Sequence, residues 1–182
     1  MKGFNLMTNY RRNYLPGGTF FFTVNLFNRK QTLLIEHIDK LRTSFRIVLA
    51  EQPFVINAIV ILPDHLHAVL TLPPSDSDFS NRWRKIKTNF SKSVYSNNHI
   101  SKSRRSKGER SIWQRRFWEH TIRDQTDMQQ HIDYIHFNPV KHGHCNKVSD
   151  WHYSSFHRFV NDGVYPEDWA GGINETLNTG ER

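Results

Sequence analysis

The stretch FVINAIVILPDHLHAVLTL, residues 54–72, decides the fold that this chain adopts. Its two halves, residues 54–62 and 65–72, are rich in β-branched and aliphatic residues, a composition typical of strands. Only Pro63 and Asp64 separate them, and so short a link joins antiparallel neighbours. The sequence therefore predicts a β-hairpin around which the other elements are arranged.

Further elements are expected on both sides of this hairpin. Before it, the run TFFFTVNLF at 19–27 predicts a strand, and apolar positions near the 3.6 period over 34–50 predict an amphipathic helix. After it, three elements are expected: a basic helix over 79–95, a strand over 112–122, and a helix from Asp124 or Thr126 to Asn138. The order indicates an α+β fold: a ferredoxin-like or RNA-recognition-like βαββαβ antiparallel sheet with an additional C-terminal helix.

The size and composition are those of one domain. The 182 residues suffice for a single core, and the one cysteine, Cys145, excludes an internal disulfide framework. No apolar run approaches the roughly 18 residues needed to cross a bilayer. We expect a domain over residues 1–160, a polar tail over 161–182, and no membrane partner.

Positive charge is concentrated in one part of the chain. The net charge is +8, and residues 79–123 hold thirteen Lys or Arg against two acids. Such a run is most often a solvated surface. Here it is interleaved with aromatic residues, and cations beside aromatic rings suit single-stranded nucleic acid. A nucleic-acid partner is therefore predicted.

Two histidines interrupt the apolar second half of the hairpin. Residues two apart on a strand point to the same side, so His65 and His67 project together while Leu66 and Ala68 enter the core. This spacing fits either a metal site or two hydrogen-bonded polar residues on a half-open face.

The last helix carries a polar line next to an apolar one. At 100° per residue, Met128, Ile132 and Ile135 face the sheet. The neighbouring line consists of His131, Tyr134 and Asn138. These polar side chains are expected where the helix meets the sheet.

The sequence resembles the HUH single-tyrosine transposases, specifically the REP-associated tyrosine transposases related to the IS200/IS605 elements. The resemblance rests on YRRNYLPGGTFFFTVNL, VILPDHLHAVLTLP, RWRKIKTNFSK, IWQRRFWEHTIRD and HIDYIHFNPVKHG, which span about residues 10–143. It implies that His65 and His67 bind a divalent metal, Mg²⁺ or Mn²⁺, and that Tyr134 is the catalytic nucleophile. It implies Asn138 as third ligand, where related insertion-sequence enzymes commonly carry Gln.

The implied activity is cleavage and rejoining of single-stranded DNA at palindromic, REP-type hairpins through a 5′-phosphotyrosine intermediate. The resemblance, together with the basic loop and the long C-terminal segment, favours a monomer over a dimer. The single cysteine fits a reducing cytoplasm, so a cytoplasmic, nucleoid-associated protein is expected. A non-catalytic hairpin-DNA or RNA binding regulator on the same fold is the alternative.

Several basic and aromatic residues are predicted to hold the DNA. Arg115 and Arg116 alternate on the expected fourth strand, so only one of them faces the active site. His131 is a possible accessory base, but a DNA contact or a structural role is favoured for it. The full set of predicted contacts is Tyr10, Arg11, Arg12, Arg82, Arg84, Lys85, Lys87, Arg115, Arg116, Lys141 and His142.

Overall fold

The computed structural model describes residues 12–95, 100–171 and 179–180, and its centre is a four-stranded antiparallel sheet. The strands are β1 (Thr19–Asn25), β2 (Val55–Ile61), β3 (His65–Thr71) and β4 (Trp118–Thr121), in the spatial order β2-β3-β1-β4. This confirms the predicted ferredoxin-like arrangement, in which the first and third strands are central.

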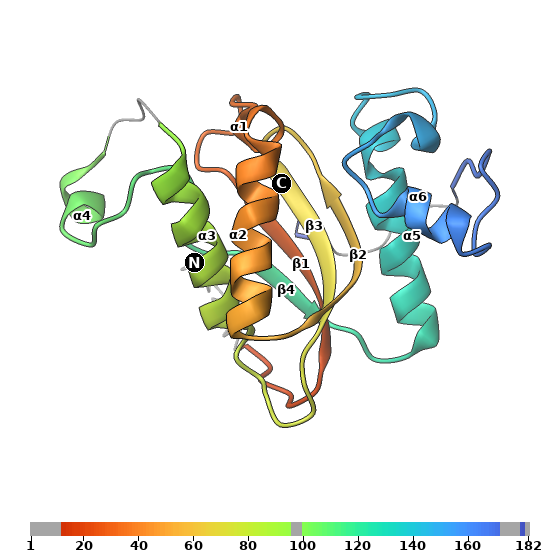
Figure 1. Ribbon diagram of the computed structural model, residues 1–182, viewed down its shortest axis with the longest axis horizontal. Helices are drawn as coiled ribbons and strands as arrows, with labels where there is room; N and C mark the ends of the chain where they lie inside the picture. The colour runs from red at the N-terminus through yellow and green to blue at the C-terminus, as the bar shows by residue number, and fades with distance from the viewer. Residues whose placement is uncertain (1–11, 96–99, 172–178, 181–182) are drawn as a thin grey trace, which may run out of the picture.

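Three helices cover one face of the sheet: α1 (Leu33–Glu36), α2 (Ile38–Glu51) and α3 (Phe79–Ser93). In Figure 1, α2 and α3 lie side by side across the strands. Alternate strand residues such as Phe20, Phe22 and Leu66 point to this side and pack with Trp83 in the first core.

The opposite face is covered by α5 (Gln125–Lys141), α6 (Phe156–Asn161) and a short 3-10 helix, η1 (Val148–Asp150). Here Phe21 and Val69 of the sheet pack against Tyr134 and Ile135 of α5 in a second core. Strand β3 is therefore enclosed on both faces and paired on both edges. Of the two interpretations of the histidine pair, the half-open face does not occur, because α5 covers this side of β3.

The tyrosine-bearing helix is longer than predicted. It passes through Pro139 and ends at Lys141 instead of stopping at Asn138. Proline lacks an N–H but has a helical φ, so near the end of a helix it removes one bond without preventing the last turn. The added turn is held by the His142 N–H, which donates to the Asn138 carbonyl at 3.0 Å.

Two other elements also differ from the predictions. The helix expected over 34–50 is divided at His37, whose backbone (φ −119°, ψ 36°) leaves the helical region. The fourth strand is short because its regular pairing with β1 begins only at Trp118. Lys87 Nζ donates to the Gln114 carbonyl at 2.6 Å, and Trp113 forms only an isolated bridge to Leu26.

The described chain beyond residue 160 continues to pack on the second core. Tyr165 is buried, Trp169 is partly buried against the same cluster, and Thr179 is 6 % exposed. In the basic region, 96–99 lie outside the described residues and Lys102–Arg105 form a single helical turn, α4. Among the described residues, no helix is both long and apolar enough to cross a bilayer.

Candidate active site

The two histidines of β3 lie on the side of the sheet that α5 covers, and both are buried. The Nδ1 of His65 lies 2.7 Å from Asp64 Oδ1, and Arg29 pairs with the same carboxylate. Burial alone would raise the pKa of Asp64, but the hydrogen bonds from His65 and Arg29 outweigh it and lower this pKa to about 2. An ionised carboxylate only accepts, so Nδ1 of His65 donates to it, and in the neutral imidazole Nε2 then carries the lone pair.

The proton of His67 is located by Thr23. The Thr23 hydroxyl donates its single hydrogen to the main-chain oxygen of Thr179. It lies 2.9 Å from His67 Nδ1, to which it can then only be an acceptor. His67 therefore also carries a hydrogen on Nδ1, and neutral imidazoles of this tautomer coordinate a metal through Nε2.

A polar stripe on α5 passes along both histidines. The Tyr134 ring lies 5.3 Å from the His67 ring, centroid to centroid, and the His142 ring lies 5.3 Å from that of His65. Asn138, which is fully buried, stands between them at four-residue spacing. The structure thus brings together the four residues predicted for chemistry, on one side of the sheet.

Two donors converge on the Tyr134 phenol, which is 3 % exposed. Lys141 Nζ donates to its oxygen at 3.0 Å, and the Thr179 hydroxyl donates at 2.9 Å. The Lys141 ammonium also lies 4.6 Å from the centroid of the tyrosine ring. Hydrogen bonds and a nearby cation both stabilise negative charge on this oxygen.

His131, the possible accessory base, makes its contacts away from that phenol. Its ring stacks on His120 with centroids 4.7 Å apart and packs against Phe21, also at 4.7 Å. Its Nδ1 lies 2.8 Å from the Asp127 main-chain oxygen. These contacts favour the structural role among those considered for His131.

Arg82 is corrected as a DNA contact. Its side chain is only 1 % exposed, and the guanidinium donates to Asp76 Oδ2 at 2.7 Å and to the Pro53 carbonyl at 2.9 Å. Further bonds reach the carbonyls of Gln52 and Asp78. Arg82 therefore joins α3 to the preceding loop and to the end of α2, and it has no surface to offer a phosphate.

Four other predicted contacts line one basic cleft of about 590 Å³ between α3 and the segment 104–117. These are Arg12, Arg84, Lys87 and Arg115. The same cleft contains four bases that were not singled out: Lys92, Arg104, Lys107 and Arg110. Burial lowers the pKa of Lys87 to about 8. Arg12 lies 4.3 Å over the Phe117 ring, so cations and an aromatic surface occur together.

The remaining predicted contacts lie elsewhere. Lys85 pairs with Glu51 of α2 at 2.7 Å, and Arg116 is exposed. Both Arg115 and Arg116 precede β4, so the expected alternation on that strand does not occur. Tyr10 and Arg11 lie outside the described residues. Among the aromatic residues interleaved with the basic region, Trp83 and Trp113 are in the core.

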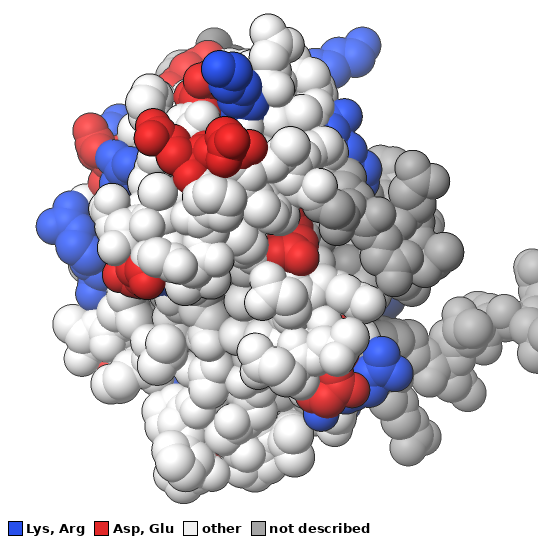
Figure 2. All heavy atoms as spheres, turned by 90° about the vertical axis from the view of Figure 1, so that its right-hand side faces the viewer, with Lys and Arg blue, Asp and Glu red and all other residues white. Residues whose placement is uncertain are grey.

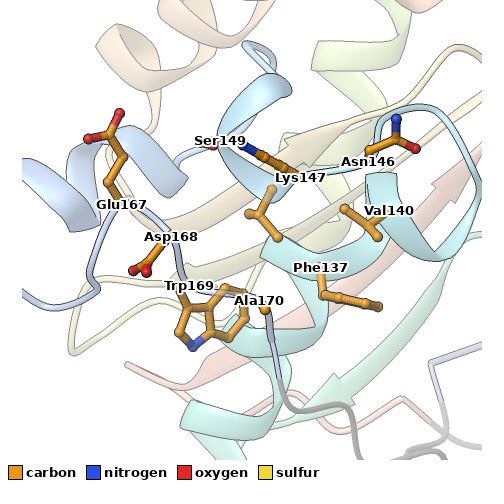
Figure 3. Close-up of a pocket in the computed structure, with 10 residues that line it drawn as sticks. Phe137, Val140, Asn146, Lys147, Ser149, Glu167, Asp168, Trp169 and Ala170 are labelled. Carbon is orange, nitrogen blue, oxygen red and sulfur yellow. The ribbon is translucent and has the colours of Figure 1, made fainter.

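The face formed by α5 and α6 has a different character. In Figure 2 most of its visible described surface is uncharged, and Lys and Arg stand mainly toward its margins. A second cavity of about 690 Å³ lies here, between Phe137 and Val140 of α5 and the segment 167–170 (Figure 3). Tyr134 and the β3 histidines do not line it, so this cavity is separate from the candidate active site.

Sequence reasoning missed three partners of the predicted site residues. Asp64 directly precedes His65, and its place in the turn was the available signal. Lys141 lies seven residues, or two helical turns, beyond Tyr134, but ending the helix at Asn138 concealed that they share a face. Thr179 is distant in sequence, and nothing local connects it to Tyr134.

The known proteins relevant to this chain by sequence are described as transposases. The family model described as "Transposase IS200 like" matches residues 21–138. A REP-associated tyrosine transposase of Escherichia coli K12 is 48 % identical, with 97 % of this chain and 98 % of that protein covered. A putative REP-associated tyrosine transposase of Haemophilus influenzae is 45 % identical, with 91 % and 94 % covered.

A solved structure gives the same result. A REP-associated tyrosine transposase bound to a REP hairpin superposes with a TM-score of 0.83 at 48 % identity, covering 97 % of this chain and 98 % of that one. The family model covers well over half of the chain, and the relatives cover nearly all of it. The chain therefore belongs to the IS200-like transposases and, among them, to the REP-associated tyrosine transposases.

Proposed function

We propose that this protein is a metal-dependent single-stranded DNA endonuclease and strand transferase that acts at palindromic, REP-type hairpins. The observation that carries the proposal is the position of the Tyr134 ring, 5.3 Å from that of His67, beneath α5. The solved relative is bound to a REP hairpin, which supports the same class of DNA for this chain.

The donor set fits a divalent metal. His65 and His67 each have a partner on Nδ1, which orients Nε2, and Asn138 supplies an amide oxygen from the adjacent stripe. Two nitrogens and one oxygen accept Mn²⁺ readily, and the oxygen suits Mg²⁺. Such an ion, when bound, would withdraw charge from the scissile phosphate.

Tyr134 would act as the nucleophile. Its oxygen bonds to phosphorus as the bond from phosphorus to the 3′-oxygen breaks, which leaves a 5′-phosphotyrosine and a free 3′-OH. The phenol proton passes to solvent, and the departing 3′-oxygen takes a proton from solvent. Lys141 stabilises the phenolate through its ammonium group. The new ester retains the energy of the old one, so another 3′-OH can reverse the reaction.

The basic cleft beside α3 would hold the DNA backbone. Its Lys and Arg neutralise phosphates, whereas the face formed by α5 and α6 offers little positive charge. We further propose that the protein works as a monomer in the cytoplasm, associated with the nucleoid. Tyr134 already lies beside His67 of its own chain, so a complete site needs no partner subunit. The catalytic domain would comprise residues 1–160, and the segment 161–182, predicted as a polar tail, contributes Thr179 to the site.

The rival is a binding regulator that uses the same fold without catalysis. The test is incubation of the protein and Mn²⁺ with a hairpin-bearing single strand, labelled in separate samples at its 3′ or 5′ end. Transfer to Tyr134 predicts that the 3′-labelled fragment remains attached to denatured protein, while the 5′-labelled fragment is released.

The adduct should disappear with EDTA and in Tyr134→Phe. Tyr95→Phe is the matched control, because Tyr95 is 77 % exposed and lies outside the site. If the folded wild-type protein shifts the DNA band on a native gel but forms no adduct, the binding regulator would be the better-supported function. Preference for a ribose strand would instead favour RNA recognition.

A further inference from the structure

A second group of metal-ligating side chains lies where β4 meets the first turns of α5. Asp127 and His131 are four residues apart, so they share one face of the helix. His120 approaches them from β4. Asp127 and His131 are 4 % and 1 % exposed, whereas the side chain of His120 is 26 % exposed and gives access from solvent.

The spacing of these groups is that of ligands around one ion. His120 Nε2 lies 2.8 and 3.1 Å from the two carboxylate oxygens of Asp127. His131 Nδ1 lies 3.1 Å from Oδ1 and also 2.8 Å from the Asp127 main-chain oxygen. The three ligand atoms all lie within 4.8 Å of one another. Neighbouring ligands about 2.1 Å from a shared ion stand roughly 3 Å apart, so the distances suit a shared ion once the two stacked imidazoles turn toward it.

Two of the three side chains are already in their ligand protonation states. Burial would raise the pKa of Asp127, but hydrogen bonds from His120 and Arg123 lower it to about 2, so it is a carboxylate. Burial lowers the pKa of His131, which favours the neutral imidazole. Metal binding requires these forms. To bind an ion through Nδ1, His131 would also give up its hydrogen bond to the Asp127 main-chain oxygen.

The competing explanation is a hydrogen-bonded cluster alone. Arg123 donates to Asp127 through its main-chain N–H at 3.0 Å and through Nε at 3.2 Å. The Arg123 side chain is 73 % exposed, so its guanidinium can move into solvent when a cation arrives. The main-chain donor can remain, since a carboxylate oxygen has capacity for both a ligand bond and a hydrogen bond.

The cluster is separate from the proposed catalytic site. The Phe21 ring stands between them, with its centroid 4.7 Å from that of His131 and 5.4 Å from that of His67. An ion at one site is therefore divided from the other by an aromatic side chain of β1. Both sites nevertheless involve α5, which carries Tyr134.

We propose that His120, Asp127 and His131 form a second metal site, which takes a transition-metal ion such as Zn²⁺ or Co²⁺ and joins β4 to α5. Two imidazoles and a carboxylate suit these ions better than Mg²⁺, which prefers an oxygen-rich set. The ion would fix the start of the tyrosine-bearing helix on the sheet. This inference does not depend on the proposed function.

The experiment is a Co²⁺ titration followed by visible ligand-field absorption. It uses full-length protein with His65→Ala and His67→Ala, which removes the proposed catalytic ligands. We expect one equivalent of Co²⁺ to give an absorbing complex, and Zn²⁺ to displace it. Adding His120→Asn should weaken Co²⁺ binding by at least about 100-fold, because loss of an outer partner alone costs about 10–100-fold.

The matched control is His152→Asn on the same background. His152 is exposed and stacks on His157 at 5.8 Å, so it tests adventitious binding by surface histidines. Circular dichroism establishes that each variant is folded, and an increase of Tm with Zn²⁺ that requires His120 gives a second readout. Absence of the complex in the folded background protein, or a complex equally strong with His120→Asn, would overturn the proposal.

Discussion

The Nζ of Lys141 lies 3.0 Å from the phenol oxygen of Tyr134, two helical turns earlier on α5. The relationship exists because α5 continues through Pro139, and it places a cation on the oxygen that would attack DNA.

Replacing Lys141 with Met should slow formation of the protein–DNA adduct by about 10–100-fold. A hydrogen bond to a charged group contributes about 1.5–3 kcal/mol, and about 1.4 kcal/mol corresponds to tenfold in rate. The rate should be measured in single turnover across pH, and the variant should need a higher pH to approach the wild-type rate. Lys147→Met, a change at the second cavity, is the control. A wild-type rate in Lys141→Met would remove Lys141 from the chemistry.

Replacing Asp64 with Asn should weaken Mn²⁺ binding by about 10–100-fold, the usual effect of losing an outer-shell partner of a ligand histidine. The amide cannot accept from His65 Nδ1 with the strength of an ionised carboxylate. Calorimetric titration with Mn²⁺ measures the change independently of cleavage. Asp39→Asn on α2 is the control, since its side chain is 89 % exposed. Equal affinities in all three proteins would contradict the role of Asp64.

Substitution of Arg82 should affect stability, whereas substitution of Arg84 should affect DNA binding. Arg82→Met removes a buried ion pair and should lower the free energy of unfolding by about 3 kcal/mol. Arg84→Met should change stability by no more than about 0.5 kcal/mol. The slope of log binding constant against log salt concentration for hairpin binding should become shallower by about one unit, which corresponds to one lost phosphate contact. Urea unfolding and binding at two salt concentrations test the pair. Weaker binding by folded Arg82→Met at unchanged stability would restore Arg82 as a DNA contact.

The carboxylate of Asp127 should make the fold sensitive to acid. Its pKa of about 2 in the folded protein is below the ordinary value of 3.8. The ionised carboxylate therefore contributes fully to stability above the pKa that Asp127 has in the unfolded chain. This contribution declines as pH falls toward 2. Between pH 6 and 2.5, in EDTA, the free energy of unfolding of wild type should fall by about 1.5 kcal/mol more than that of Asp127→Asn. Urea unfolding across that range measures the difference, and parallel pH profiles would refute it.

The fold could be predicted because its main signals are local. The hairpin of β2 and β3 follows from two apolar strands and the Pro63–Asp64 link, and their alternation places His65 and His67 on one side. The fourth strand could not be delimited in the same way. Its first half bonds to Lys87 of α3 and to β1, which are contacts that no local pattern encodes.

The residues of the site could be predicted where their spacing follows the period of a helix or a strand. Tyr134 and Asn138 follow the helical period, and the structure places both beside β3. Arg82 was misjudged because its neighbours in sequence are exposed bases. Its burial depends on carbonyls contributed by the end of α2. The cluster of His120 with Asp127 and His131 likewise requires a strand and a helix to meet.

Strand β3 has hydrogen-bonded neighbours on both edges and a core on each face. Its amide hydrogens should consequently be among the last to exchange with deuterated water, because opening them disrupts both layers at once. The two imidazoles thus sit on the strand that should open least readily. On heating, their positions should be lost only when the whole domain unfolds.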